Sequence, residues 1–138
     1  MIEFRPPRIL DASALVELFS GHPGVMQVLD EASDDGYFVV VPTLAIAEAQ
    51  AVIGAASDHW YHVLSVPALR ILDLSAPVAI EVGRIAGPRL RNHPVQAPLI
   101  GPLMTAQVLY EAKMLSAAIG TTVPEAYGGH EVAVHSLN

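Results

Sequence analysis

The sequence predicts a single domain over residues 1–138 of the α/β class, an α/β/α sandwich built on a mainly parallel sheet of four or five strands. Short apolar runs alternate with stretches whose apolar residues recur at helical spacing, and this alternation is typical of a parallel sheet covered by helices. Hydrophobic residues make up 52% of the chain and charged residues 15%, which excludes a disordered protein. The chain has no cysteine, so disulfides and thiolate metal sites are excluded.

The net charge of −7 and the thin spread of basic residues argue against a protein that holds nucleic acid through a basic surface. They do not exclude a metal-dependent nuclease with a local site. The N-terminus lacks the apolar core of a signal peptide, and Pro42 and Glu48 interrupt the most apolar stretch, residues 37–56. We therefore expect a cytoplasmic protein that does not associate with a membrane.

The first half of the chain predicts two strands, each followed by helical sequence. The second strand is a continuous β-branched and aromatic run, which is typical of a strand covered on both faces. In order, the elements are a strand ending at Ile9 and Leu10, helices over residues 12–20 and 25–32, a strand over residues 37–41, and a helix that begins at Pro42 and Thr43.

The second half begins with an aromatic and histidine-rich segment, residues 58–66. It could form a base-stacking patch, but we favour a packed helix or a lid over the core. His93 lies in a proline-rich loop, and a single loop histidine does not make a metal site. The remaining predicted elements are a strand at 70–74, a helix at 76–86, the loop at 87–102, a helix at 103–115, a strand at 117–121, a turn at 122–125 and a last strand at 131–135 with Val132 and Val134 facing inward.

Two carboxylates occupy matching positions in this order of elements. Asp11 directly follows the first strand, and Glu48 lies on the helix after the second. Each has a simpler alternative, because Asp11 could only cap a helix and Glu48 could only face solvent. Parallel strands end at one edge of a sheet, so both can converge on one crevice. Convergent carboxylates without cysteine or paired histidines suit Mg²⁺ or Mn²⁺, and we expect Asp11 and Glu48 to be the metal ligands.

At these residues the chain resembles the PIN-domain family, compact nucleases that include the toxins of many toxin–antitoxin pairs. The run Ile9-Leu10-Asp11-Ala12-Ser13-Ala14 is similar to the family's opening motif, and the segment 41–48, ending in Glu48, is similar to its second motif. The order of elements agrees along nearly the whole chain. The resemblance implies metal-dependent cleavage of RNA, with Asp11 and Glu48 as the catalytic acids.

The family's third and fourth acids are missing. Thr105 stands where the third acid opens the late long helix, and Val123 stands where the fourth follows the last strand of the parallel set. No aspartate follows Asp73, so no change of register restores them. The resemblance assigns Ser13, Thr105 and Thr121 supporting positions, and Glu125 is the nearby acid that could substitute.

These observations favour a degenerate PIN domain of the toxin–antitoxin type, with weak or lost metal-dependent RNase activity and weak metal binding. The alternatives are an active Mg²⁺- or Mn²⁺-dependent endoribonuclease and a module that only binds a partner. The implied partners are RNA, an antitoxin-like protein and a second copy of the chain. A nucleotide-binding protein is disfavoured, because no glycine-rich phosphate loop follows the first strand.

Overall fold

The computed structural model describes residues 6–92 and 95–138, so His93 and the extreme N-terminus lie outside the described residues. Within these two ranges, no helix combines the length and the apolar character needed to cross a bilayer. The elements in order are β1 Arg8–Leu10, α1 Ala12–Phe19, α2 Pro23–Asp35, β2 Val39–Pro42, α3 Thr43–Ile53, α4 Ser57–Leu64, β3 Leu69–Leu72, α5 Ala76–Asn92, α6 Pro102–Leu115, β4 Ala118–Thr121, the short 3₁₀ helix η1 Pro124–Tyr127, and β5 Val134–Ser136.

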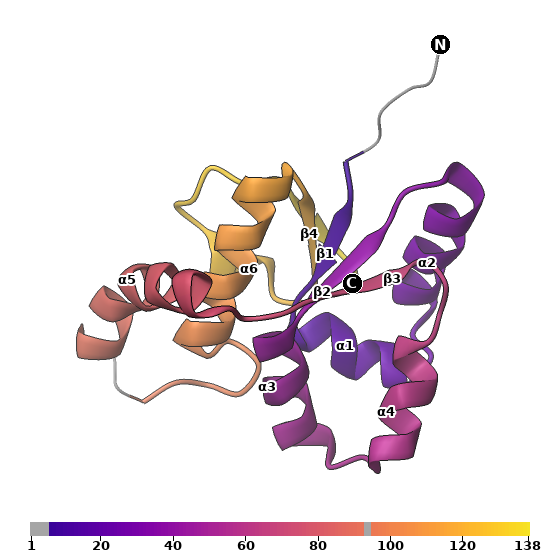
Figure 1. The fold of residues 1–138 in the computed structure, drawn as a ribbon, viewed down its shortest axis with the longest axis horizontal. Coiled ribbons are helices and arrows are strands. Elements are labelled where there is room, and N and C mark those ends of the chain that lie inside the picture. Colours follow the sequence, from indigo (N-terminus) through magenta and orange to yellow (C-terminus); the bar gives the residue numbers. More distant parts are fainter. Residues whose placement is uncertain (1–5, 93–94) are drawn as a thin grey trace.

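The strands form one five-stranded sheet in the order β3-β2-β1-β4-β5, with every neighbouring pair parallel. The central strand places Ile9 opposite Val40 on one side and opposite Ile119 on the other. Helix α6 covers one face of the sheet with α5 packed against it, and α1 and α2 lie on the other face (Figure 1). The predicted α/β/α sandwich is confirmed.

The strand order reverses at β1. The chain first adds β2 and β3 on one side of β1 and then adds β4 and β5 on its other side. Connections leaving β1 and β4 therefore diverge, and such a switch point leaves a crevice at the carboxyl ends of the two strands. Asp11 follows β1 at this point, and Thr121 ends β4.

Strand β2 is buried along its whole length, as expected for a strand between two helical layers. The predicted strand began two residues earlier, at Tyr37. Phe38 instead lies at the edge of the core, half-exposed, with the Arg70 guanidinium 4.2 Å from the centre of its ring. This cation–π contact shields the ring where the sheet no longer does.

Helix α5 is longer than predicted. It continues past residue 86 to Asn92 and includes Pro88 in its interior, so the loop before α6 is shorter than the proline spacing indicated. A proline removes one helical hydrogen bond but does not prevent the helix from continuing when tertiary packing holds it. Here Val82 and Ala86 are buried with Ala106 of α6 in a small second core.

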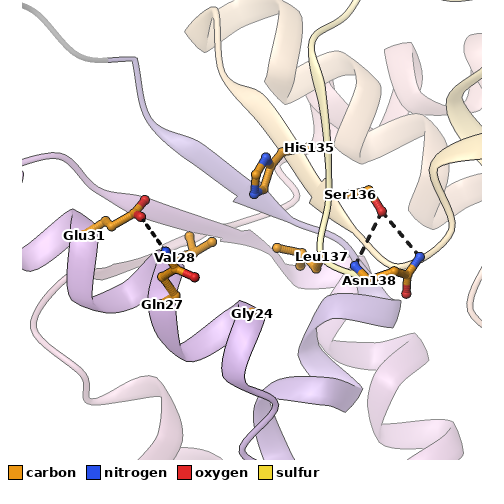
Figure 2. A pocket seen from close by; sticks show the side chains of 8 residues that line it. All are labelled: Gly24, Gln27, Val28, Glu31, His135, Ser136, Leu137 and Asn138. Carbon is orange, nitrogen blue, oxygen red and sulfur yellow. Dashed lines mark hydrogen bonds between the residues drawn. The ribbon is translucent and has the colours of Figure 1, made fainter.

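The prediction for the last strand was wrong in position and in orientation. Strand β5 begins three residues later than predicted, at Val134, and its residues are exposed because it pairs with β4 alone at the edge of the sheet. The buried residue of this segment is Leu137, whose side chain points toward Val28 of α2 in a pocket between α2 and the C-terminal segment (Figure 2).

The aromatic segment forms helix α4 and packs against the core, as favoured from the sequence. Trp60 is buried, meets Phe19 of α1 edge-to-face at 4.4 Å between ring centroids, and donates its indole N–H to Gln50. Tyr61 on the same helix is exposed. One side of the segment is therefore a packed helix, and Tyr61 lies on its exposed side.

A buried glutamine positions helix α3, which carries Glu48. Helix α3 has no side-chain cap of its own. The side chain of Gln107, on α6 and fully buried, accepts a hydrogen bond from the Leu44 N–H at 2.9 Å and donates to the Leu72 carbonyl at 3.4 Å. A side chain from α6 thus joins the start of α3 to the end of β3.

We predict that Gln107→Leu lowers the free energy of unfolding by about 1–3 kcal/mol, because it leaves the Leu44 N–H and the Leu72 carbonyl without their partner. Urea unfolding followed by circular dichroism measures the change. The matched control is Gln27→Leu on the exposed side of α2, which should change the value by less than about 0.5 kcal/mol. Equal stability of the two variants would contradict the role of Gln107.

Candidate functional site

Asp11 is the N-cap of α1, and its backbone is still extended as it leaves β1. Its Oδ1 accepts a hydrogen bond from the Ala14 N–H at 3.0 Å. The residue is 0% exposed. Asp11 therefore caps the helix, the simpler of the two roles considered from the sequence, but its burial and its further contacts go beyond what a cap requires.

Three hydroxyl groups complete the hydrogen bonding of the Asp11 carboxylate. Ser13 Oγ donates to Oδ1 at 2.7 Å, and Thr121 Oγ1 donates to Oδ2 at 2.6 Å. Tyr127 OH also donates to Oδ2, at 2.8 Å. With the helix N–H, each carboxylate oxygen accepts two hydrogen bonds, which compensates the burial of a charge.

Ser13 and Thr121 therefore lie where they were expected, in contact with Asp11. They also organise the chain after β4, because Ser13 Oγ accepts from the Thr122 N–H and Thr121 Oγ1 accepts from the Val123 N–H. Val123, which stands where an acid was expected, ends up in this turn as the N-cap of η1.

Tyr127 was not identified from the sequence. It lies at the end of η1, six residues past β4, and no motif distinguishes it from the other tyrosines. Burial raises the pKa of its hydroxyl far above the usual value, and the neighbouring Asp11 carboxylate, which accepts its hydrogen bond, and Glu48 raise it further, while Arg89 lowers it. Tyr127 is therefore a neutral hydrogen-bond donor at any physiological pH.

Glu48 reaches the same crevice from α3. It is half-buried, and its Oε1 accepts the Gly101 N–H, just before α6, at 2.8 Å. A Cβ at residue 101 would lie 2.7 Å from Glu48 Oε2, so glycine permits this approach. The charges of both Asp11 and Glu48 act on the Tyr127 hydroxyl, so both carboxylates lie in the neighbourhood of this tyrosine. Glu48 is not a solvated residue on an exposed helix face.

The other two predicted residues are not joined to Asp11 by hydrogen bonds in the described part of the chain. Thr105 is buried on the first turn of α6, and its hydroxyl has no hydrogen-bond partner among the described residues. Glu125 lies on η1 and is exposed. The start of α6 therefore carries the neutral hydroxyl of Thr105, and η1 carries the solvated carboxylate of Glu125. The family pattern has an acid at the start of this helix and another after the strand.

This set of donors does not fit a resident divalent metal. Mg²⁺ and Mn²⁺ need carboxylate oxygens with free lone pairs, and both oxygens of Asp11 are already occupied by protein N–H and O–H groups. One oxygen of Glu48 is occupied as well. Over residues 6–92 and 95–138, no three acidic or histidine side chains cluster in a way that could hold a metal ion. Metal binding by Asp11 and Glu48 stays a prediction, with a donor set that favours weak binding.

Comparison with known proteins places the fold. No protein-family model matches the sequence, and no curated protein matches it. Among solved structures, VapBC2 from Rickettsia felis, bound to a DNA fragment from its promoter, aligns over 94% of this chain and 98% of its own with a TM-score of 0.66 and 16% identity. DNA-bound VapBC from Salmonella typhimurium aligns over 97% and 100% with a TM-score of 0.66 and 11% identity.

FitAcB from Neisseria gonorrhoeae aligns over 94% of this chain and 97% of its own, with a TM-score of 0.56 and 19% identity. Identities this low establish the fold and nothing finer. VapC, the toxin of the VapBC complexes, is a PIN-domain protein. The strand order, the buried aspartate after the first strand and these alignments lead to one conclusion: the chain has the PIN-domain fold.

Proposed function

We propose that this protein is a single-domain, toxin–antitoxin-type PIN protein whose metal-dependent RNase activity is weak or lost. The observation that carries the proposal is the saturated carboxylate of Asp11, which accepts four hydrogen bonds from the protein itself. In this environment the negative charge is balanced by fixed donors, and a cation is not needed to balance it.

A metal ion would have to displace some of these donors. Hydrogen bonds to a charged group contribute roughly 1.5–3 kcal/mol each, so exchanging even one for a metal ligand offsets much of the gain from the metal. The two absent acids at Thr105 and Val123 lower the attraction for the ion further. Mg²⁺ can be held by one or two carboxylates together with substrate phosphates, which is why we propose weak rather than strictly absent activity.

The alternative function is an active endoribonuclease that uses Asp11 and Glu48, with Ser13 and Thr121 as support. The observation that favours it is the convergence of Asp11 and Glu48 on the crevice beside Tyr127. Glu48 is only half-buried, so one of its oxygens could still reach a ligand.

The proposed partners are an antitoxin-like protein and a second copy of the chain. The structures of similar fold include VapBC complexes bound to DNA and a toxin–antitoxin complex from Klebsiella pneumoniae. In this protein a net charge of −7 opposes direct contact with DNA, so we propose that any such contact is made by the partner. A chain that only binds its partner, with no chemistry at all, is the limiting case of this proposal.

We predict that Asp11→Asn and Glu48→Gln each change the rate of RNA cleavage in Mg²⁺ or Mn²⁺ by less than about tenfold relative to the wild type. Removing an essential catalytic group would lower the rate far more. Gel analysis of a labelled RNA measures the rates. The control is Asp73→Asn, at an exposed aspartate outside the crevice. A rate that falls at least about a hundredfold in both crevice variants and not in the control would instead establish the nuclease.

We further predict that Tyr127→Phe binds Mn²⁺ more tightly than the wild type, because it removes one donor that competes with a cation for Asp11 Oδ2. Isothermal titration calorimetry measures the affinity. Tyr37→Phe is the matched control, since Tyr37 is also buried but contacts the Val28 carbonyl on α2. Micromolar binding by the wild type that is lost in Glu48→Gln would refute the weak-metal proposal.

A further inference from the structure

A pocket of about 310 Å³ lies between α5 and α6. These two helices lie side by side (Figure 1). The turn that contains η1 closes its third side, through Ala126 and His130. Most of its wall is apolar, from Ile85 on α5 and from Ala106 and Leu109 on α6. Its size is at the lower end of the range for small-molecule sites.

The wall also contains a buried polar group without a partner. Thr105 is 4% exposed, and its Oγ1 finds no hydrogen-bond partner among the described residues. A buried hydroxyl that makes no hydrogen bond is destabilising, and such groups in native proteins are uncommon. Thr105 lines this pocket, so an acceptor atom bound there would satisfy the hydroxyl.

A cation lines the pocket on the opposite helix. Arg89 is half-buried near the end of α5 and forms no ion pair with the residues that the structure describes. By contrast, the exposed Arg84 one turn earlier is paired with Glu81. A partly desolvated guanidinium without a carboxylate partner favours an oxyanion, which it can bind through two parallel N–H groups.

None of the acids in the described part of the chain forms an ion pair with Arg89. Glu48 lies on α3, and its Oε1 already accepts a hydrogen bond from the Gly101 N–H, just before α6. Glu125, on η1, is exposed to solvent. The family pattern would add a third acid at position 105, where this chain has a neutral threonine. The local charge at this end of α6 is therefore less negative than the pattern implies.

We infer that the pocket between α5 and α6 binds a small organic oxyanion, a phosphate or carboxylate attached to an apolar group. Arg89 holds the oxyanion, the Thr105 hydroxyl donates to it, and the apolar group packs on Ile85, Ala106 and Leu109. The exposed His130 lies at the rim. The inference does not depend on the proposed function, because it uses neither Asp11 nor a metal.

The test is calorimetric titration of the full chain with phenyl phosphate, benzoate, inorganic phosphate and the neutral probe benzyl alcohol. We expect at least one of the two organic anions, phenyl phosphate or benzoate, to bind. That anion should bind more tightly than inorganic phosphate and more tightly than benzyl alcohol. Arg89→Gln should weaken that binding at least about tenfold, as expected for loss of a charge-assisted pair. The matched control is Arg91→Gln, an exposed arginine two residues along α5 that does not line the pocket.

Thr105→Val separates a ligand-binding role from a structural one. Removing a buried, unpartnered hydroxyl should leave the melting temperature equal or higher, while the affinity for the oxyanion falls. Three results would overturn the inference: no binding of either organic anion at millimolar concentration, equal losses in Arg89→Gln and Arg91→Gln, or unchanged affinity in Thr105→Val. Equal losses in the two arginine variants would mean nonspecific attraction to positive charge.

Discussion

The fully buried carboxylate of Asp11 is the constraint on which this end of the molecule depends. A charge removed from water is strongly destabilising unless fixed donors surround it. Those donors come from α1, from the end of β4 through Thr121, and from η1 through Tyr127. The pairing of β1 with β4 and the turn after β4 must therefore be in place together before the charge is compensated.

The same hydrogen bonds determine the chemistry available in the crevice. A carboxylate that balances its charge against hydroxyl groups is a poor ligand for a hard cation, although it lies at the carboxyl end of a strand beside the switch point, where open α/β sheets bind ligands. Glu48 follows a similar pattern, since α3 is positioned by Gln107 and the Glu48 carboxylate is held by the Gly101 N–H. Both acids serve the structure of the crevice, and this is the physical basis for proposing a weakened nuclease.

The charges that line the pocket between α5 and α6 also disfavour a bound cation. A nuclease that collects cations concentrates carboxylates around one point, whereas in this chain the neutral Thr105 and the cationic Arg89 line one pocket. The effect of Arg89 on the Tyr127 hydroxyl links this pocket electrostatically to the crevice. A pocket lined by a guanidinium and a hydroxyl that have no partner among the described residues is suited to an anion, and an anion bound there would act electrostatically on the Asp11 network.

Local sequence determined the parallel α/β architecture, because apolar runs and helical periodicity encode which faces are buried. It singled out Asp11 and Glu48 by their places after a strand and on a helix, while the resemblance to PIN domains pointed to Ser13 and Thr121. It could not locate Tyr127. That residue meets Asp11 across 116 positions, and only the packing of η1 against the sheet edge brings them together. The alternating residues of β5 likewise did not indicate that it is an edge strand. Its residues are exposed because the described sheet has no further strand on that side. Sequence thus determined which residues could form a site, while tertiary structure decided that the carboxylate is surrounded by hydroxyl donors, because long-range contacts alone set which groups share a buried space.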